Sequence, residues 1–168
     1  KHGITLYTRE PIPVEASHIL DKIHAKLASS VLYDKDDTFR IFLCKTKAIY
    51  WLLSPLNRYG FASSYPLTDN IVVARTNLSS NTSRTYRTTN KRFLSDVITH
   101  ECGHVLIARR LGRQTAYFKP KWLQEGYCEY IAGSSTISNE HGNALIRDQW
   151  EGESVPFDYY MWRRMVEY

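Results

Sequence analysis

The stretch from residue 93 to residue 110, FLSDVITHECGHVLIARR, constrains the fold more than any other part of the chain. Apolar side chains surround its centre on both sides, a pattern that predicts a long helix with a buried apolar face. The centre carries His100 and His104, which are four residues apart and therefore lie on the same side of a helix. Two buried imidazoles without partners would be costly, and shared coordination of a metal ion is one way to offset that cost. The alternative is a helix that carries two histidines by coincidence.

Glu101 directly follows the first histidine and completes an H-E-x-x-H pattern. Zinc accepts imidazole nitrogen readily and is held by four ligands in a tetrahedron. In this pattern the two histidines bind the metal, and the glutamate takes a proton from the water that the metal activates. The sequence therefore predicts Zn²⁺ as the cofactor, His100 and His104 as its ligands and Glu101 as a general base.

A catalytic zinc site needs a third protein ligand besides the two histidines. One common arrangement would place a glycine at 107 and a histidine at 110, but the chain has Ile107 and Arg110, which excludes it. The other common arrangement uses a glutamate on the next helix. The segment 120–133, PKWLQEGYCEYIAG, supplies Glu125 one turn into such a helix, with a proline at its entry and a glycine at its exit. His141 is the alternative ligand if Glu125 does not serve.

Hydrophobic periodicity predicts a first half that mixes strands with two helices and a second half that is mainly helical. The expected strands cover residues 3–8, 39–45, 60–66 and 70–75, and the expected helices cover residues 13–30, 47–54, 91–110, 121–133 and 156–168. The segment 76–90 is rich in Ser, Thr and Asn, which predicts an exposed, mobile loop. Together these elements predict an α+β fold, with a small mixed or antiparallel sheet followed by a helical part, in one domain over residues 1–168.

The composition excludes several other classes of protein. Hydrophobic residues make up 43% of the 168 residues, which is typical of a globular domain and not of a disordered chain. No apolar run approaches the roughly 20 residues that span a bilayer. The formal net charge of +5 is mild and is spread over several segments, so we expect no nucleic-acid partner.

The three cysteines, Cys44, Cys102 and Cys128, are an odd number and form no C-x-x-C pair, so no disulfide framework is predicted. We expect Cys102 and Cys128 to be small buried residues of the two helices. The chain begins at Lys1 and not at Met, so a preceding signal peptide or membrane anchor is a further expectation, and with it an exported or membrane-anchored protein.

The motif HECGH at 100–104, followed by WLQEGYCEY at 122–130, resembles the Glu-zincins, the clan of thermolysin-like and aminopeptidase-like zinc peptidases. The likeness is greatest to the small peptidase MA-like domains, and it covers under a fifth of the chain. The resemblance implies a zincin-like fold and hydrolysis of peptide bonds, with an endopeptidase expected. It also implies that His100, His104 and Glu125 are the zinc ligands and that Glu101 is the general base.

The resemblance implies three further roles. Glu129 would orient His100 by accepting a hydrogen bond from its second ring nitrogen, the alternative being a surface carboxylate. Tyr160, or else Tyr159, would stabilise the oxyanion of the reaction, the alternative being a tyrosine that only packs. The strand at 70–75 would hold the substrate backbone at a sheet edge, the alternative being an ordinary strand.

The chain also departs from the clan. It has no run that resembles G-A-M-E-N, which argues against an aminopeptidase, and the part that follows Glu125 is short. A zinc metallopeptidase acting on a peptide or protein substrate is the main functional hypothesis. The alternative is a catalytically silent metallopeptidase-like domain that binds zinc or a partner.

Overall fold

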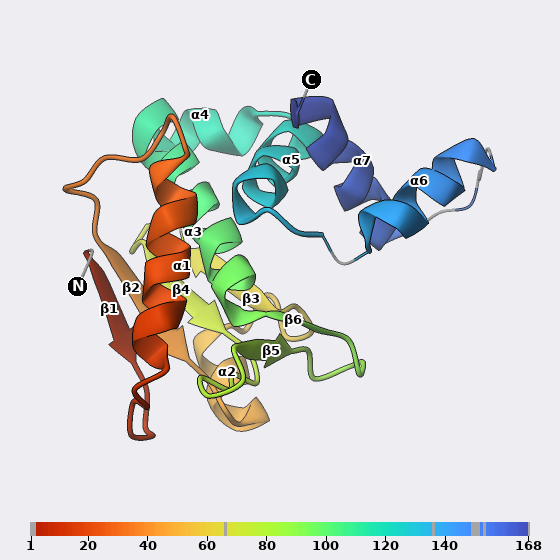
Figure 1. Ribbon diagram of the computed structural model, residues 1–168. Helices are drawn as coiled ribbons and strands as arrows, with labels where there is room; N and C mark the ends of the chain where they lie inside the picture. Colours follow the sequence, from red (N-terminus) through yellow and green to blue (C-terminus); the bar gives the residue numbers. More distant parts are fainter. Residues whose placement is uncertain (1–2, 66, 136, 149–151, 153, 168) are drawn as a thin grey trace.

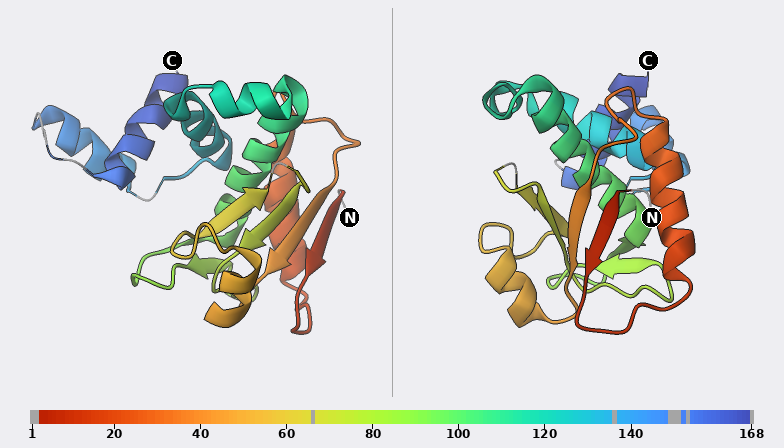
Figure 2. Two further views of the ribbon diagram at one scale, coloured as in Figure 1. Left: turned by 180° about the vertical axis from the view of Figure 1, so that it is seen from behind. Right: turned by 90° about the vertical axis from the view of Figure 1, so that its left-hand side faces the viewer.

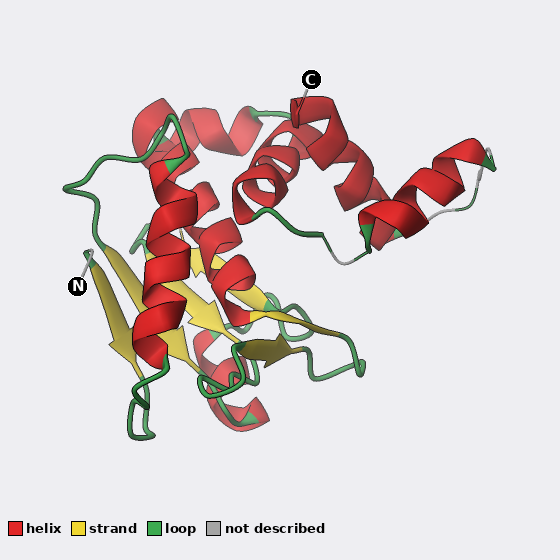
Figure 3. Cartoon of the chain, in the orientation of Figure 1, coloured by secondary structure: helices red, strands yellow, loops and turns green. Residues whose placement is uncertain are grey.

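The computed structural model describes residues 3–65, 67–135, 137–148, 152 and 154–167, and it confirms the predicted mixed α+β fold (Figure 1, Figure 3). The strands are β1 (Ile4–Tyr7), β2 (Phe39–Leu43), β3 (Ala62–Tyr65), β4 (Asn70–Val73), β5 (Thr82–Arg84) and β6 (Lys91–Phe93). The helices are α1 (Ala16–Ala28), α2 (Lys47–Leu53), α3 (Leu94–Leu111), α4 (Arg113–Phe118), α5 (Lys121–Ala132), α6 (Asn139–Arg147) and α7 (Val155–Glu167).

The main sheet has the strand order β1-β2-β4-β3. Strands β1, β2 and β4 run parallel, and β3 runs antiparallel to β4. The chain passes from β1 to β2 through α1, because two parallel strands need a long crossover between them. Strand β4 therefore lies inside the sheet and β3 forms its edge, which corrects the expectation that residues 70–75 form the edge strand. Periodicity locates strands along the chain but does not give their order in a sheet.

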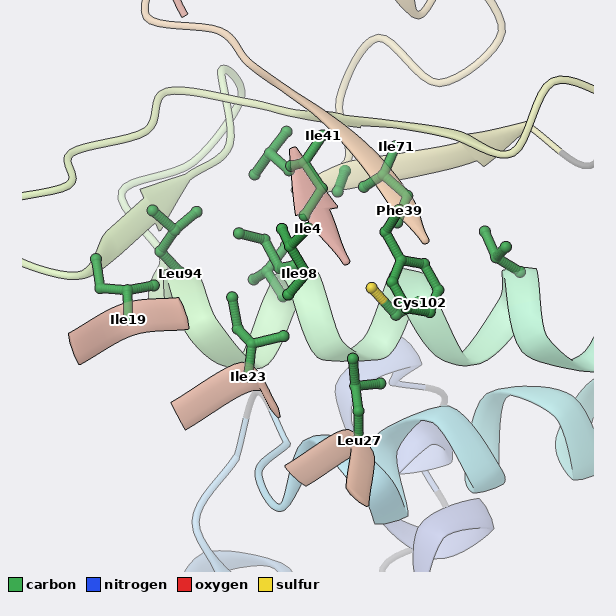
Figure 4. Close-up of a cluster of buried hydrophobic side chains, with 14 of the residues drawn as sticks. Ile4, Ile19, Ile23, Leu27, Phe39, Ile41, Ile71, Leu94, Ile98 and Cys102 are labelled. Atoms are coloured by element: carbon green, nitrogen blue, oxygen red, sulfur yellow. The ribbon is translucent and has the colours of Figure 1, made fainter. Parts of the chain in front are cut away.

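Helices α1 and α3 cover one face of the sheet, and α2 covers the other (Figure 1, Figure 2). Figure 4 shows how apolar side chains of α1, α3 and the sheet meet in the main core. Ile23 and Leu27 of α1 and Ile98 of α3 are almost completely buried there. On the opposite face, Tyr50 of α2 is fully buried in a smaller cluster. The regular spacing of apolar residues in α1 therefore corresponds to a helix that buries one face against the sheet.

The segment 76–90, expected to be an exposed loop, instead leads into an antiparallel hairpin of β5 and β6. Ser83 is fully buried, and its Oγ donates a hydrogen bond of 2.8 Å to the carbonyl of Ala74. The hydroxyls of Thr85 and Thr88 lie 2.9 Å apart in the connection between the strands. Polar side chains that satisfy one another can be ordered without an apolar pattern, which is why the sequence did not indicate this hairpin.

The same hairpin fixes the beginning of α3. The backbone N–H of Leu94 donates to the carbonyl of Asn81, and the N–H of Ser95 donates to its Oδ1, at 2.9 Å and 3.0 Å. Asn81 has a φ of 48°, a conformation that Asn tolerates better than most residues. Its two acceptors satisfy N–H groups that a helix cannot satisfy internally. The helix therefore begins at Leu94, three residues later than periodicity predicted.

Helix α5 begins after Pro120 and ends before Gly133, as predicted. Two short helices, α4 and α6, were not expected from periodicity. Helix α6 is capped by Ser138, whose side chain accepts a hydrogen bond of 3.2 Å from the N–H of His141. The cysteines are free and buried, as expected. Within the described residues, no helix combines the length and the apolar character needed to cross a membrane.

Replacing Ile98 with alanine should lower the free energy of unfolding by about 3 kcal/mol, because the deleted carbons leave a cavity in the main core. Ile98 is 1% exposed, whereas Leu52 on α2 is 79% exposed. The matched Leu52→Ala control should change the stability by less than about 0.5 kcal/mol. Urea denaturation of the three proteins measures both differences. Equal effects of the two substitutions would contradict the packing described here.

Candidate metal centre

Helix α3 carries both histidines on the side that faces α5. Nε2 of His100 and Nε2 of His104 lie 3.2 Å apart, and their rings are nearly perpendicular. His100 is buried and His104 is partly buried. At this distance one ring nitrogen can donate a proton to the other, and both can direct lone pairs at a shared cation once that proton is absent.

Helix α5 brings a carboxylate to the same point. Oε2 of Glu125 lies 3.3 Å from Nε2 of His100 and 3.5 Å from Nε2 of His104. This oxygen is buried, and no group in the described part of the chain forms a hydrogen bond of normal geometry with it. The three atoms predicted to be metal ligands are thus brought together, and a buried carboxylate oxygen without a regular donor is what a cation would satisfy. Two imidazole nitrogens and one carboxylate oxygen are a suitable donor set for zinc.

The pKa values of these groups reflect their mutual contact. Burial alone would lower the pKa of His100, but Glu125 and Glu129 outweigh burial and raise it from 6.5 to about 9. Burial alone would raise the pKa of Glu125, but the two imidazoles outweigh burial and hold it well below its usual range. The cluster of imidazoles and carboxylates therefore favours the binding of one positively charged species, and a proton and a metal ion compete for the same site.

Glu129 lies one turn after Glu125 and is fully buried. Its Oε1 is 2.9 Å from Nδ1 of His100, the ring nitrogen that faces away from His104. Arg92 of β6 holds the same carboxylate with two hydrogen bonds, from its Nη1 at 2.9 Å and its Nη2 at 3.1 Å. The hydroxyl of Ser135 donates a further bond of 2.8 Å to Oε2. Glu129 therefore lies where the orienting carboxylate for His100 was predicted, and it is not a surface residue.

Burial alone would raise the pKa of Glu129, but the contact with His100 and the charge of Arg92 outweigh it and lower the pKa to about 2. Glu129 is therefore ionised at neutral pH, and its charge attracts the Nδ1 side of the His100 ring. The role of Arg92 was not predicted, because its position was assigned to the helix and not to the hairpin that precedes it.

Cys128 offers an alternative third donor. Its Sγ and one nitrogen from each of the two histidines lie within 4.8 Å of one another, so these three residues also form a group that could hold a metal ion. Burial raises the pKa of the Cys128 thiol well above 9, whereas a thiol binds zinc as the thiolate. Glu125, in contrast, is ionised and lies on the wall of the cleft described below. Glu125 and Cys128 are therefore two candidate third donors beside the histidines.

Gly103 lets the two site helices approach each other closely. A Cβ at this position would lie 2.8 Å from Sγ of Cys128 and 2.9 Å from Cδ1 of Ile131. Both distances are shorter than real Cβ contacts, so a larger residue would push α5 away from α3. This geometry accounts for the helix-weakening glycine inside the H-E-x-x-H motif.

The site opens into a cleft of about 1310 Å³. His100, Glu101, His104 and Glu125 all line it. The other walls come from β3 and the loop before it, from the β5–β6 hairpin, and from residues of α4, α5 and α7. Glu101 is buried at 9% exposure, on the same cleft wall as the histidines, as the motif predicts.

Tyr160 does not lie at this site. It is fully buried on the other side of α7, where its hydroxyl donates a hydrogen bond of 2.7 Å to Oδ1 of Asn143. Tyr159 lies at the site instead, with its ring centroid 6.3 Å from that of His100, and it lines the cleft. Neighbouring residues of a helix point about 100° apart, so an error of one position exchanges the two roles. Burial and then the charge of Glu125 raise the pKa of Tyr159 well above its usual range.

His141 is exposed on α6 and does not line the cleft, so the alternative ligand is not brought to the site. No family model matches the chain, and neither a curated protein nor a solved structure matches it. Function is therefore inferred from the residues and their geometry alone.

Replacing Arg92 with glutamine should destabilise the protein by about 3 kcal/mol, because the buried charge of Glu129 loses its main partner. Thermal or urea unfolding measures this loss. Arg84→Gln is the matched control, since Arg84 is exposed on the same hairpin and should cost less than about 0.5 kcal/mol. Adding Glu129→Gln to Arg92→Gln should recover part of the loss, because a neutral amide is cheaper to bury than a carboxylate. A loss no larger than that of Arg84→Gln would refute the proposed importance of the ion pair.

Metal-free protein should lose stability as the pH rises from 6.5 to about 9. The folded pKa of His100 is raised, so in this range the folded chain keeps a proton that the unfolded chain has released. The stabilisation is complete below pH 6.5 and is lost above about 9. Urea unfolding in a chelator at several pH values measures the decline. His100→Gln should remove it, and the exposed control His18→Gln should keep it; a flat profile for the parent would count against the described contacts.

Proposed function

We propose that this protein is a zinc-dependent metallopeptidase, an endopeptidase with a zincin-like fold, similar to the Glu-zincins. One observation carries the proposal: Nε2 of His100, Nε2 of His104 and Oε2 of Glu125 converge within 3.2 to 3.5 Å of one another, on a cleft that Glu101 also lines. The second contact of His100, with the carboxylate of Glu129, supports the proposal because ligating histidines usually have such a partner.

His100, His104 and Glu125 would hold the ion through two nitrogens and one oxygen. Three protein ligands leave one position for water or substrate, as in catalytic zinc sites and unlike closed structural ones. When bound, zinc supplies Lewis-acid chemistry, which polarises a carbonyl and makes water acidic enough to react at neutral pH.

The side chains of the cleft would carry the proton transfers and the charge stabilisation. Glu101 would accept a proton from the attacking water and then donate it to the amine that leaves. Tyr159 is protonated at neutral pH, as its raised pKa requires, and its hydroxyl can donate a hydrogen bond to the oxygen on which negative charge develops. This proposal assigns to Tyr159 the role that the sequence suggested for Tyr160.

The cleft supports a polypeptide substrate. Its volume of about 1310 Å³ exceeds the roughly 300 to 1,000 Å³ that is common for small-molecule sites. Ala62, Ser63 and Ser64 of the edge strand β3 line it, and among the described strands β3 pairs only with β4. An extended peptide could pair with the free edge of β3, and its backbone would then be held independently of its sequence.

Elemental analysis of protein purified without added metal tests the metal ligands. The parent should contain about one zinc per chain, and Glu125→Ala should lose most of it, because truncation removes one of three ligands. Cys128→Ala is the matched control on the same helix and should keep its zinc. Loss of zinc in Cys128→Ala but not in Glu125→Ala would assign the third ligand to the thiol.

Glu101→Gln tests the catalytic role on the same preparations. It should keep its zinc and lose at least about 100-fold in cleavage rate against a peptide library, the size expected for a general base. A zinc-loaded parent that cleaves nothing in the library would support the catalytically silent alternative. Undiminished cleavage by Glu101→Gln would refute the assignment of the base.

A further inference from the structure

The segment that precedes α3 has an unusual charge. Residues 70–93 contain five basic residues, Arg75, Arg84, Arg87, Lys91 and Arg92, and no Asp or Glu. The β5–β6 hairpin lies within this segment (Figure 1), and residues of its connection line one wall of the cleft. The hairpin contributes Thr85, Arg87, Thr88, Asn90 and Arg92 to that wall. Two of these cations, Arg87 and Arg92, therefore lie on the hairpin wall of the cleft.

The cations of the cleft differ in whether a carboxylate already neutralises them. Arg92 is held by Glu129, and Arg113, at the α4 end of the cleft, lies 3.6 Å from Asp69. Arg87 is exposed, and within the described part of the chain no carboxylate forms an ion pair with it. Its guanidinium lies 5.8 Å from the centroid of the Tyr59 ring, a cation–π distance. Arg87 is thus placed on the cleft wall by an aromatic ring while its charge remains available.

The carboxylates of the cleft do not cancel this charge. Glu101 and Glu125 lie at the metal centre, where the two positive charges of a divalent cation would offset them. The β5–β6 hairpin leads into the beginning of α3, and α4 follows the end of α3. The hairpin wall and the α4 wall of the cleft therefore lie at opposite ends of α3, a helix of 18 residues. The α4 end contributes the exposed side chain of Phe118. The cleft is therefore basic on one side of the histidines and partly apolar on the other.

We propose that Arg87 forms an anion-binding subsite of the cleft, so that the preferred substrates are polypeptides with an Asp or Glu side chain on one side of the cleaved bond. The proposal rests on the proposed peptidase function. Asn90, near Arg87 on the same wall, adds an amide donor that suits a carboxylate. An acidic side chain there would gain a charge-assisted hydrogen bond that its amide analogue lacks.

Cleavage of a proteome-derived peptide library by the zinc-loaded protein, read by mass spectrometry, should reveal Asp and Glu enriched at a position on one side of the cut only. A peptide pair that differs by Asp against Asn at that position then gives a ratio of kcat/KM. We expect about fivefold in favour of Asp, the size of an ion pair at a solvent-accessible site. The ratio should fall toward one in 0.5 M salt, because salt screens exposed charges.

Matched variants locate the preference. Arg87→Gln should reduce the Asp-to-Asn ratio of kcat/KM to about one. Arg87→Glu should instead favour a peptide with Lys at the same position. Arg84→Gln removes the same charge from the same hairpin, but Arg84 does not line the cleft, so the ratio should persist. If Arg84→Gln and Arg87→Gln lowered the Asp-to-Asn ratio equally, the preference would come only from the overall electrostatic field of the hairpin. The subsite would then be refuted.

Measurements of peptide binding test the anion-binding subsite independently of the proposed peptidase activity. In Glu101→Gln, fluorescence anisotropy should show tighter binding of the labelled Asp peptide than of the Asn peptide, and adding Arg87→Gln should remove the difference. Absence of cleavage by the parent would contradict the peptidase proposal. Cleavage or binding without any preference for Asp over Asn would overturn the subsite and leave the peptidase proposal intact.

Discussion

The buried charge of Glu129 is the constraint on which the candidate site depends. A carboxylate without access to water is tolerated only if its oxygens are paired, and here the partners come from three separate parts of the chain. Arg92 comes from the hairpin, His100 from α3 and Ser135 from the segment after α5. Satisfying one side chain therefore fixes the position of all three segments. The orientation of the His100 ring, and with it the direction of the atom that faces Glu125, follows from that arrangement.

Local sequence patterns were sufficient to predict much of the fold and part of the candidate site. The spacing of His100 and His104 predicted a shared helix face, because a helix converts sequence distance into a fixed direction. The roles of Glu125 and Glu129 were implied by the resemblance of the two motifs to the Glu-zincins. Tyr159 was not selected over Tyr160, since nothing local defines which face of α7 meets α5. Arg92 was missed because its partner is 37 residues away and the contact depends on the hairpin. The inner position of β4 was missed because the chain passes from β2 through α2 to β3, and β4 then pairs between these two strands, which the pattern of a single strand does not indicate.

The β5–β6 hairpin combines three functions that usually belong to separate elements. Asn81 at its start satisfies the first N–H groups of α3, Arg92 at its end pairs with Glu129, and Arg87 between them faces the cleft. The polar composition that made this segment look like a mobile loop is the composition that these contacts require. A substitution that destabilises the hairpin would therefore alter the positions of the histidines in two ways, through the beginning of α3 and through Glu129.

The packing of α7 on α5 has a consequence for the order in which the protein acquires its properties. A Cβ at Gly126 would lie 2.4 Å from the carbonyl oxygen of Trp162, so α7 rests directly on the backbone of the helix that carries Glu125. Every buried residue of the main core lies at or before Leu106, whereas Glu125, Glu129 and Tyr159 come later in the chain. During synthesis from the amino terminus, the sheet and its two covering helices can collapse before Glu125 and α7 have left the ribosome. The candidate site would thus be completed only after the main core has formed.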